Sequence, residues 1–545
     1  MASSSLRIRR RSASSSGEVN SPGRKLNKEE RPVPSRDIQF DAMWPFFVRL
    51  ACSSIASWRI LAAMTLEMPT RVLDVERLAR ELGNWRTASS SGPVYQGLAD
   101  GIRMLIVDGR LPVGARLPSE RALAECLRVS RTTVTSAYAQ LREDGYLLAR
   151  RGARSTTALP ATPNADTPPA VSRGAVNLAN AALAAPVPAV LAALTAATGQ
   201  MAPYLHDTGI ELTGVPSLRR AVAERYCERG LPTEPDDIMI TTGALHAIGL
   251  ILATYTQPGD RVLVEQPTYH GALAAISTAG ARAVPVAIGE DGWDLGALHN
   301  AVRQLAPSLA YVVPDNHNPT GLTMPQPQRE ELAAMIADTR TRTIVDETMT
   351  EVWLDEPVPP PVATAMTRRR DLLLTIGSMS KSFWGGLRIG WIRADPSTLA
   401  SIAALRPSID MGTPILEQLA AAELIRVADD VLPERREILR TRRALMLSLL
   451  DEHLPDWQPC PGGGGLALWV RLPTPMSSAL SAAASRMGLD VPPGPRFGVD
   501  GSLERFIRIP YTLPPEQMTE AVTLLARAWH AVTGATAPQQ RVVVV

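Results

Sequence analysis

One lysine stands apart in this arginine-rich sequence. The chain contains three lysines: Lys25 and Lys28 lie in the N-terminal stretch, and Lys381 is alone between residue 29 and the end. An arginine side chain stays protonated and cannot condense with an aldehyde, whereas a desolvated lysine amine can act as a nucleophile and form a Schiff base. Lys381 is therefore a candidate for covalent chemistry. The alternative is chance in an arginine-biased chain, and the neighbouring residues decide between the two.

Three other segments offer groups that would complement an aldehyde held at Lys381. Asp346 in IVDET supplies an acid for a pyridinium nitrogen, Asn318 in PDNHNPTG an amide for a phenolic oxygen, and Tyr269 in EQPTYHG a ring for stacking. Taken singly, each of these residues is also compatible with an ordinary turn, core or surface position.

Two further segments supply groups that would bind an anion. Together with these groups, the set of candidate residues is specific enough to indicate one kind of ligand. Gly243 and Ala244 in TTGALHA follow a strand-like stretch and open a helical one, where backbone N–H groups and the helix dipole attract anions. Ser378 and Arg388 flank Lys381 in SMSKSFWGGLRIGW and add a hydroxyl and a cation. Amine, acid, amide, ring and phosphate cradle are the groups that pyridoxal 5'-phosphate (PLP) requires. The sequence therefore predicts a PLP site.

The elements that would position these groups alternate from about residue 175 onward. Helical stretches alternate with the apolar segments IMITT, RVLVE, AYVVP, TIVDE, LLLTIG and RIGWIR. This alternation predicts an α/β fold with a mainly parallel sheet. Ligands bind beyond the carboxyl ends of such strands, and the polar clusters follow those ends.

A separate pattern occupies residues 91–158. Leu98, Ile102, Leu105 and Ile106 recur at helical spacing, and Ser119 is a suitable N-cap for a second helix, ERALAECL. A short turn leads to a third helix, and GYLLARRGARSTTA predicts two short strands. Helix, helix-turn-helix and hairpin together predict a winged helix-turn-helix; the alternative is a small helical domain with a solvated arginine face.

This segment resembles the GntR-type winged helix of bacterial transcription factors, through GRLPVGARLPSERALAECLRVSRTTVTSAYAQLREDGYL. It carries ten arginines and no lysine against six acids, a charge balance that suits a phosphate backbone. N-terminal residues of a recognition helix reach base edges in the major groove. The expected contacts with a double-stranded DNA operator are Arg121, Ser130, Arg131, Thr132, Thr133 and Gly152.

The second region, roughly residues 175–535, resembles the fold-type I PLP-dependent aminotransferases, which have a small C-terminal α+β subdomain. The resemblance implies that Lys381 is the Schiff-base lysine, that Asp346 pairs with the pyridinium nitrogen, and that Tyr269 stacks on the ring. Asn318 would bond the ring's 3-oxygen. The implied phosphate ligands are Gly243, Ala244, Leu245, Ser378 and Arg388. RFIRIPYT is similar to the family segment that grips a substrate carboxylate, which indicates Arg508, with Arg505 as the second choice.

Two positions depart from the family pattern. The family usually has a tyrosine two or three residues beyond the aspartate, where this chain has Thr348 and Met349. The G-Y-x-x-x-G stretch, from which a neighbouring subunit reaches the phosphate, has Ile210 here. Both losses are compatible with binding the cofactor and weigh against efficient transamination.

A winged helix followed by an aminotransferase-like domain is the architecture of MocR-type regulators, a GntR subfamily. The leading hypothesis is a homodimeric, PLP-binding transcriptional regulator that senses PLP or an amino compound. The second is an active aminotransferase with a DNA-binding attachment, so whether the chain is an enzyme stays open. In the third, the large domain binds no cofactor and only dimerises the DNA readers.

Composition and spacing set the remaining expectations. The predicted domains are an N-terminal extension (1–72), a winged helix (73–158), a linker (159–174), an aminotransferase-like domain (175–535) and a tail (536–545). Met64 or Met68 is a possible natural start. Arg49 and Arg59 interrupt an apolar stretch of the extension, so no membrane span is expected. The four cysteines show no metal-ligand spacing, which predicts no metal site and a cytoplasmic protein.

Overall fold

The computed structural model describes residues 73–83, 85, 93–107, 110–111, 115–148, 155–158, 176–460, 462–499 and 501–534. Gly152, the two candidate start methionines, the predicted linker and the C-terminal tail lie outside the described residues. Within the described part, no helix combines the length and the apolar character that a membrane crossing needs.

The N-terminal unit contains the predicted three helices and a hairpin, together with one additional helix. Its elements are α2 (Val75–Leu82), α3 (Val94–Val107), α4 (Glu120–Leu127), α5 (Arg131–Glu143), β1 (Leu147–Leu148) and β2 (Thr156–Thr157). β1 and β2 pair antiparallel. Ser119 and Ser130 are the N-caps of α4 and α5, since the side chain of each accepts a hydrogen bond from the backbone N–H three residues on. The apolar face of α5, formed by Val134, Ala137, Tyr138 and Leu141, is buried in the core of this unit.

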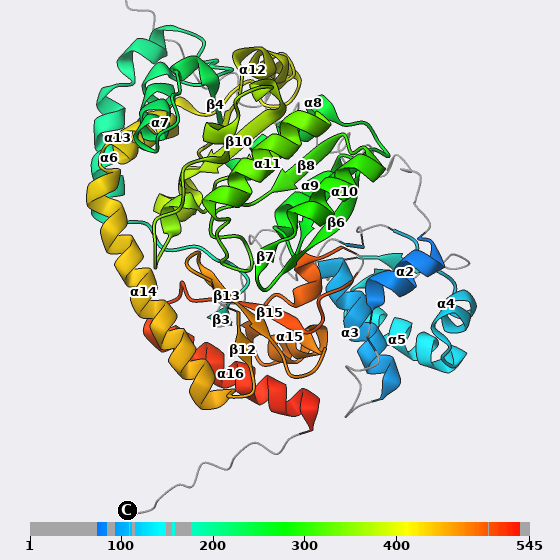
Figure 1. Cartoon of the computed structure of the whole chain (residues 1–545). Coiled ribbons are helices and arrows are strands. Elements are labelled where there is room, and N and C mark those ends of the chain that lie inside the picture. Colours follow the sequence, from blue (N-terminus) through cyan, green and yellow to red (C-terminus); the bar gives the residue numbers. More distant parts are fainter. Residues whose placement is uncertain are drawn as a thin grey trace, which may run out of the picture. The chain divides into compact units, whose positions relative to one another are not determined.

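The large unit is built on an eight-stranded sheet in the order β4-β11-β10-β9-β8-β5-β6-β7 (Figure 1). Its strands are β4 (Ile238–Thr241), β5 (Arg261–Gln266), β6 (Arg282–Gly289), β7 (Gly292–Trp293), β8 (Leu309–Val312), β9 (Thr343–Asp346), β10 (Leu373–Ser378) and β11 (Gly390–Arg393). The strands from β10 through β9, β8 and β5 to β6 are parallel. β11 runs antiparallel to both of its neighbours. The predicted mainly parallel sheet is therefore confirmed.

Helices cover both faces of this sheet. One face packs against α6 (Val187–Gly199), α7 (Pro216–Glu228), α10 (Leu295–Leu305), α11 (Gln326–Thr339) and α13 (Ile415–Arg426). The other packs against α8 (Ala244–Tyr255), α9 (His270–Thr278) and α12 (Pro396–Ala403). Successive strand residues alternate between the two cores: Ile238 and Ile240 face the first, and Met239 faces the second.

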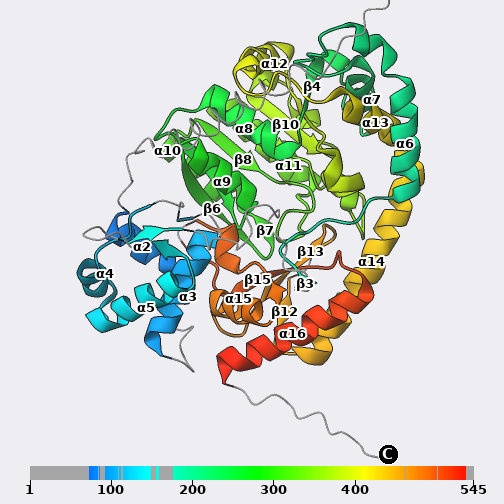
Figure 2. The same ribbon diagram turned by 180° about the vertical axis from the view of Figure 1, so that it is seen from behind.

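A smaller C-terminal subdomain follows the long helix α14 (Ala428–His453) (Figures 1 and 2). Its antiparallel sheet is β12 (Gln458–Pro459), β13 (Ala467–Arg471) and β15 (Phe506–Pro510), covered by α15 (Ser477–Arg486) and α16 (Pro515–Thr533). The first strand of the large unit, β3 (Val176–Asn177), pairs with β14 (Leu489–Asp490) of this subdomain. The chain therefore passes the smaller subdomain before it enters the large sheet.

Candidate functional site

The residues predicted to hold PLP lie at the carboxyl ends of adjacent parallel strands. Asp346 is the last residue of β9 and is paired in register with Ile376 of β10. Lys381 follows β10 in a π-helical turn, Ser380–Trp384. Tyr269 follows β5, and Asn318 follows β8. The sheet therefore brings to one edge groups that are more than a hundred residues apart in sequence.

Lys381 lines a cavity of about 290 Å³, together with Ala181, Asn318 and Met349. Its Nζ donates a hydrogen bond to the carbonyl oxygen of Ala181 at 2.8 Å. Burial, reinforced by Arg508, lowers the pKa of the Lys381 amine to about 8. Roughly one-tenth of such amines are neutral at pH 7. This neutral fraction is the nucleophilic form that covalent chemistry requires.

Asp346 is buried and held by two hydrogen bonds. Its Oδ2 accepts from the Tyr311 hydroxyl at 2.6 Å, and its Oδ1 accepts from the backbone N–H of Thr348 at 2.8 Å. Burial raises the pKa of Asp346, and the bonds from Tyr311 and Thr348 oppose that rise. A cationic ring nitrogen next to this carboxylate would supply the charge partner that a buried acid needs.

Two glycines at the predicted phosphate site have no room for a side chain. Gly243, the N-cap of α8, has a φ of 89°, and a Cβ there would lie 2.8 Å from Nη2 of Arg388. A Cβ on Gly390 would lie 2.8 Å from the backbone nitrogen of Ala244. Ser378 is buried, and its Oγ accepts a hydrogen bond from the Ser380 N–H at 3.1 Å. Leu245, also predicted here, has a largely exposed side chain in the first turn of α8.

Arg508 is a buried cation that lacks a carboxylate partner among the described residues. It is 3% exposed on β15, and its guanidinium donates to the Ala179 carbonyl and, at 3.5 Å, to Oδ1 of Asn318. Its Nε has no hydrogen-bond partner in the described part of the chain. Burial, reinforced by Arg496, lowers its pKa to about 9. An anion bound here would compensate the buried charge.

Arg505, the second choice from the sequence, points elsewhere. Its side chain is exposed and donates to the carbonyl oxygen of Pro473. The buried position of Arg508 beside Asn318 therefore favours Arg508 as the residue that would bind a substrate or effector carboxylate.

Several residues around the site were not singled out from the sequence. His270 contacts the Tyr269 ring edge-on at a centroid distance of 5.0 Å and Phe497 at 5.6 Å. Burial lowers the pKa of His270 to about 3, so its ring is neutral at physiological pH.

Tyr311, the other unpredicted contact, lies in the middle of an otherwise apolar strand. A buried hydroxyl in such a strand needs a partner, and this was the one available signal.

Taken together, these side chains fit PLP. The glycines of the cradle would admit the phosphate, the buried Asp346 would pair with the ring nitrogen, and the low-pKa amine of Lys381 would meet the aldehyde. When bound, PLP supplies an electron sink for chemistry at an amino-bearing carbon. The chain's own groups would anchor it through Lys381, balance its ring charge through Asp346 and orient a carboxylate through Arg508.

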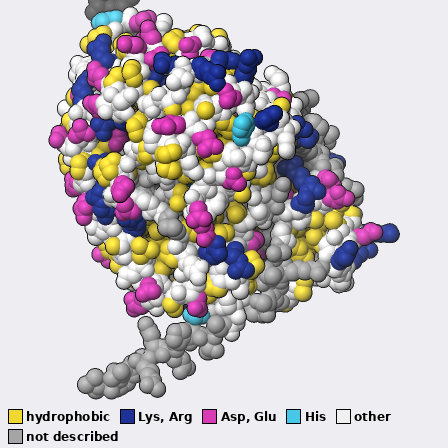
Figure 3. Space-filling model, in the orientation of Figure 1, with side chains coloured by type: hydrophobic (Ala, Val, Ile, Leu, Met, Phe, Trp, Pro, Cys, Tyr) yellow, Lys and Arg dark blue, Asp and Glu magenta, His cyan; other side chains and the backbone are white. Residues whose placement is uncertain are grey.

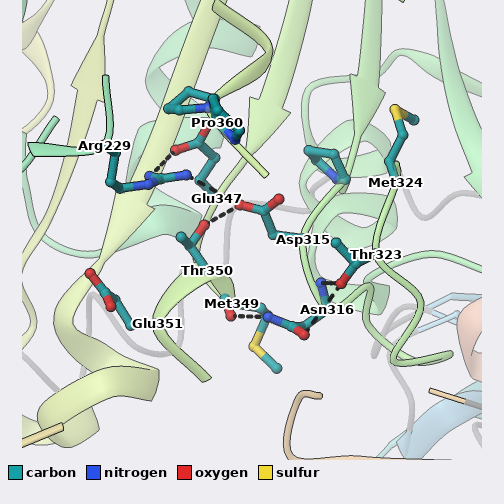
Figure 4. A network of polar contacts seen from close by, with 12 residues as sticks. Arg229, Asp315, Asn316, Thr323, Met324, Glu347, Met349, Thr350, Glu351 and Pro360 are labelled. Atoms are coloured by element: carbon teal, nitrogen blue, oxygen red, sulfur yellow. Dashed lines mark hydrogen bonds and ion pairs between the residues drawn. The ribbon is translucent and has the colours of Figure 1, made fainter. Parts of the chain in front are cut away.

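Thr348 and Met349 stand two and three residues beyond Asp346, where the family usually has a tyrosine. The Thr348 hydroxyl is buried with no hydrogen-bond partner among the described residues. The next residue, Met349, accepts a bond from Nδ2 of Asn316 through its carbonyl at 2.9 Å (Figure 4). Neither side chain supplies a phenol to the site.

Four of the predicted DNA-contacting residues, Ser130, Arg131, Thr132 and Thr133, lie at the start of α5. Ser130 Oγ lies 2.7 Å from the hydroxyls of both Thr132 and Thr133, which fixes these side chains together. The Arg131 side chain is 73% exposed, and Arg121 on α4 is also exposed. Figure 3 shows basic side chains projecting in the region of α4 and α5. The arrangement presents hydroxyls and cations from one helix N-terminus, as a major-groove reader requires.

Comparison with known protein families identifies two matches in this chain. Residues 176–525 match the family described as aminotransferase class I and II. Residues 94–156 match the family described as bacterial regulatory proteins, gntR family.

Individual relatives combine the same two parts or share the larger one. The HTH-type transcriptional regulator YdcR of Escherichia coli is 30% identical over 443 residues, which cover 76% of this chain and 94% of YdcR. The HTH-type transcriptional regulator TauR of Rhodobacter capsulatus is 28% identical, over 78% of this chain and 94% of TauR. The crystal structure of the α-aminoadipate aminotransferase LysN from Thermus thermophilus, in complex with N-(5'-phosphopyridoxyl)-L-leucine, superposes with a TM-score of 0.60. It is 27% identical and covers 67% of this chain and 94% of LysN.

Proposed function

The chain belongs to the class I and II aminotransferase family and joins that domain to a GntR-family DNA-binding domain, the MocR architecture, and from this premise we propose that it is a transcriptional regulator whose DNA binding responds to PLP or an amino compound. The observation that carries the proposal is the coexistence of two candidate sites in one chain. A recognition-helix N-terminus presents Ser130 and Arg131, and a buried amine, Lys381, faces a buried acid, Asp346. The proposed compartment is the cytoplasm.

The cofactor site carries the sensing role in this proposal. Lys381 and Asp346 would hold PLP, and Arg508 would bind the carboxylate of an amino-acid effector. A ligand changes an equilibrium only through different affinities for two states of the protein. Occupancy of this site would therefore favour one of two arrangements that differ in DNA affinity.

We infer a homodimer from an apolar surface of the large unit. Leu205 and Ile210 lie on one segment, Ile409 and Met411 on another, and all four are largely exposed. The two segments are adjacent, since a Cβ on Gly412 would lie 2.7 Å from the Glu211 carbonyl oxygen. Contiguous exposed apolar groups mark interaction surfaces, and a second copy is the occupant that would also present two winged helices to two half-sites.

Arg131→Ala is expected to weaken operator binding by about 1–3 kcal/mol, because an exposed arginine at the start of a recognition helix contacts bases or phosphates. Fluorescence anisotropy with a labelled operator, repeated across salt concentrations, would measure the effect. The matched control is Arg368→Ala, an equally exposed arginine of the large unit that pairs with Asp338, and its affinity should equal that of the wild type. Affinity should also fall steeply with salt as counterions are released; a flat salt response would contradict the DNA-binding role.

An active aminotransferase is the second candidate, because the amine, acid, amide and Arg508 are all present. Thr348 and Ile210 at the two tyrosine positions favour the regulatory role. Steady-state assays with amino acids and keto acids separate the two. Negligible turnover is expected for a regulator, whereas steady turnover at ordinary enzyme rates would establish the second candidate.

A further inference from the structure

A second cavity, larger than the one that Lys381 lines, lies on the side of the sheet covered by α7 and α13. Its volume, including the open space at its mouth, is about 560 Å³. It is enclosed by one face of α7, by the segments after β9 and β10, and by the junction of α13 with α14. Lys381, Asn318 and Arg508 do not line it.

The inner end of this cavity has a buried carboxylate that is only half satisfied. The Glu347 side chain is 2% exposed, and its Oε2 accepts from Nη1 of Arg229 at 2.7 Å. Its Oε1 has no hydrogen-bond partner among the described residues, and neither does the hydroxyl of Thr348 beside it. A buried carboxylate oxygen without a donor is unfavourable, so this end of the cavity needs a donor from a bound molecule.

The neighbouring side chains do not donate to Oε1 in this structure. Asp315 accepts from Arg329 and from the Thr350 hydroxyl (Figure 4). Nη2 of Arg229 is ion-paired with Asp315 at 3.7 Å and makes no hydrogen bond with the described residues. The unpaired Oε1 of Glu347 is an acceptor at the end of the cavity.

The charge at the outer end is also negative. Arg225 is contacted by three carboxylates, those of Glu228, Glu351 and Asp429. Arg436 lies 4.0 Å from Glu351. With Glu347 and Arg229 included, four acids stand against three cations around the cavity, a net negative charge that attracts a cation.

The walls between the two ends are apolar and aromatic. They are formed by Val222, Tyr226, Phe383, Ile425 and Leu432. The Tyr226 hydroxyl is already bonded to Nε1 of Trp391 at 3.1 Å, so this ring presents its apolar face. The body of a matching molecule would therefore be apolar.

We propose that this cavity is a binding site for a small cationic amine with an apolar or aromatic body, whose ammonium group donates to Oε1 of Glu347. The site is additional to the PLP and effector site and goes beyond the regulatory function proposed above. The two sites share a wall, because Ser378 lines the cavity and the backbone N–H of Thr348 holds Asp346.

The test uses the full-length protein loaded with PLP and the probe N,N-dimethyl-2-phenylethylamine. A tertiary amine is cationic at neutral pH and cannot condense with PLP, so binding at Lys381 does not confuse the result. Isothermal titration calorimetry should show saturable binding of one probe per chain. Glu347→Gln should weaken it by about tenfold or more, since a charged hydrogen-bond partner is lost. The uncharged analogue 2-phenylethanol should bind wild type more weakly by a similar factor.

Two further variants keep the test decisive. Glu351→Gln removes a carboxylate at the same cavity whose two oxygens already bond Arg225, and it should change affinity less than Glu347→Gln does. Ala428→Leu fills the cavity from α14, where Ala428 is 4% exposed, and should abolish binding while the visible absorbance of bound PLP persists. Absence of saturable binding to wild type up to about 10 mM would overturn the proposal, as would equal affinity in wild type, Glu347→Gln and Ala428→Leu.

Discussion

Lys381→Ala is expected to abolish the visible absorbance that the wild-type protein shows after loading with PLP and removal of the excess. The reason is that Lys381 carries the one buried amine at the site, with a pKa lowered to about 8, and arginine cannot replace its covalent chemistry. Borohydride treatment of the loaded wild type should fix the cofactor on the peptide that contains residue 381.

The control for this prediction is Lys28→Ala, because Lys25 and Lys28 are the other lysines in the chain. That variant should retain the wild-type spectrum and the wild-type stoichiometry. Retention of the absorbance by Lys381→Ala, or fixation of the cofactor on Lys25 or Lys28, would contradict the assignment of Lys381.

Asp315→Ala is expected to lower the free energy of unfolding of the large unit by about 3–5 kcal/mol, the cost of leaving a buried charge without its partner. The side chains of Asp315 and Arg329 are both 0% exposed, and they form a direct ion pair. The carboxylate of Asp315 also accepts from the Thr350 hydroxyl and lies 3.7 Å from Arg229. Its removal leaves the guanidinium of Arg329 with backbone carbonyl acceptors alone.

Denaturant unfolding of the PLP-free protein, followed by tryptophan fluorescence, measures this effect. Asp338→Ala is the matched control, since Asp338 pairs with Arg368 at the surface, where the two side chains are 56% and 67% exposed. Exposed pairs contribute at most about 1 kcal/mol. Equal destabilisation by the two substitutions would show that the buried network does not stabilise the unit as the geometry implies.

The strand-end groups were predictable from sequence because their placement follows from a local rule. Asp346 ends an apolar stretch, Tyr269 and Asn318 follow apolar stretches within a few residues, and parallel strands bring their carboxyl ends to one edge. The helices of the winged unit were also predictable from local sequence, because serine, as at Ser119 and Ser130, is favoured at helix N-caps. These parts could be predicted without knowing which distant segments are in contact.

The rest depends on contacts that local patterns do not encode. Ala179 and Ala181 reach Arg508 and Lys381 only because β3 pairs with β14, some three hundred residues later. The Arg229–Glu347 pair joins α7 to the end of β9 in the same way. The resemblance favoured Arg508 over Arg505, and the structure adds that Arg508 is the one that is buried. Helix α2 was not predicted from the sequence, although Asp74 caps it.

The most direct test of the regulatory account is to compare DNA binding with and without the cofactor. Purified full-length protein would be incubated with sheared genomic DNA from its source organism, with and without PLP, and the bound fragments sequenced. The account predicts that affinity for the bound sites differs by about fivefold or more between the two conditions, the size of ordinary allosteric coupling. Lys381→Ala should give the same binding in both. Identical site maps and affinities for the wild type, with and without PLP, would contradict the account.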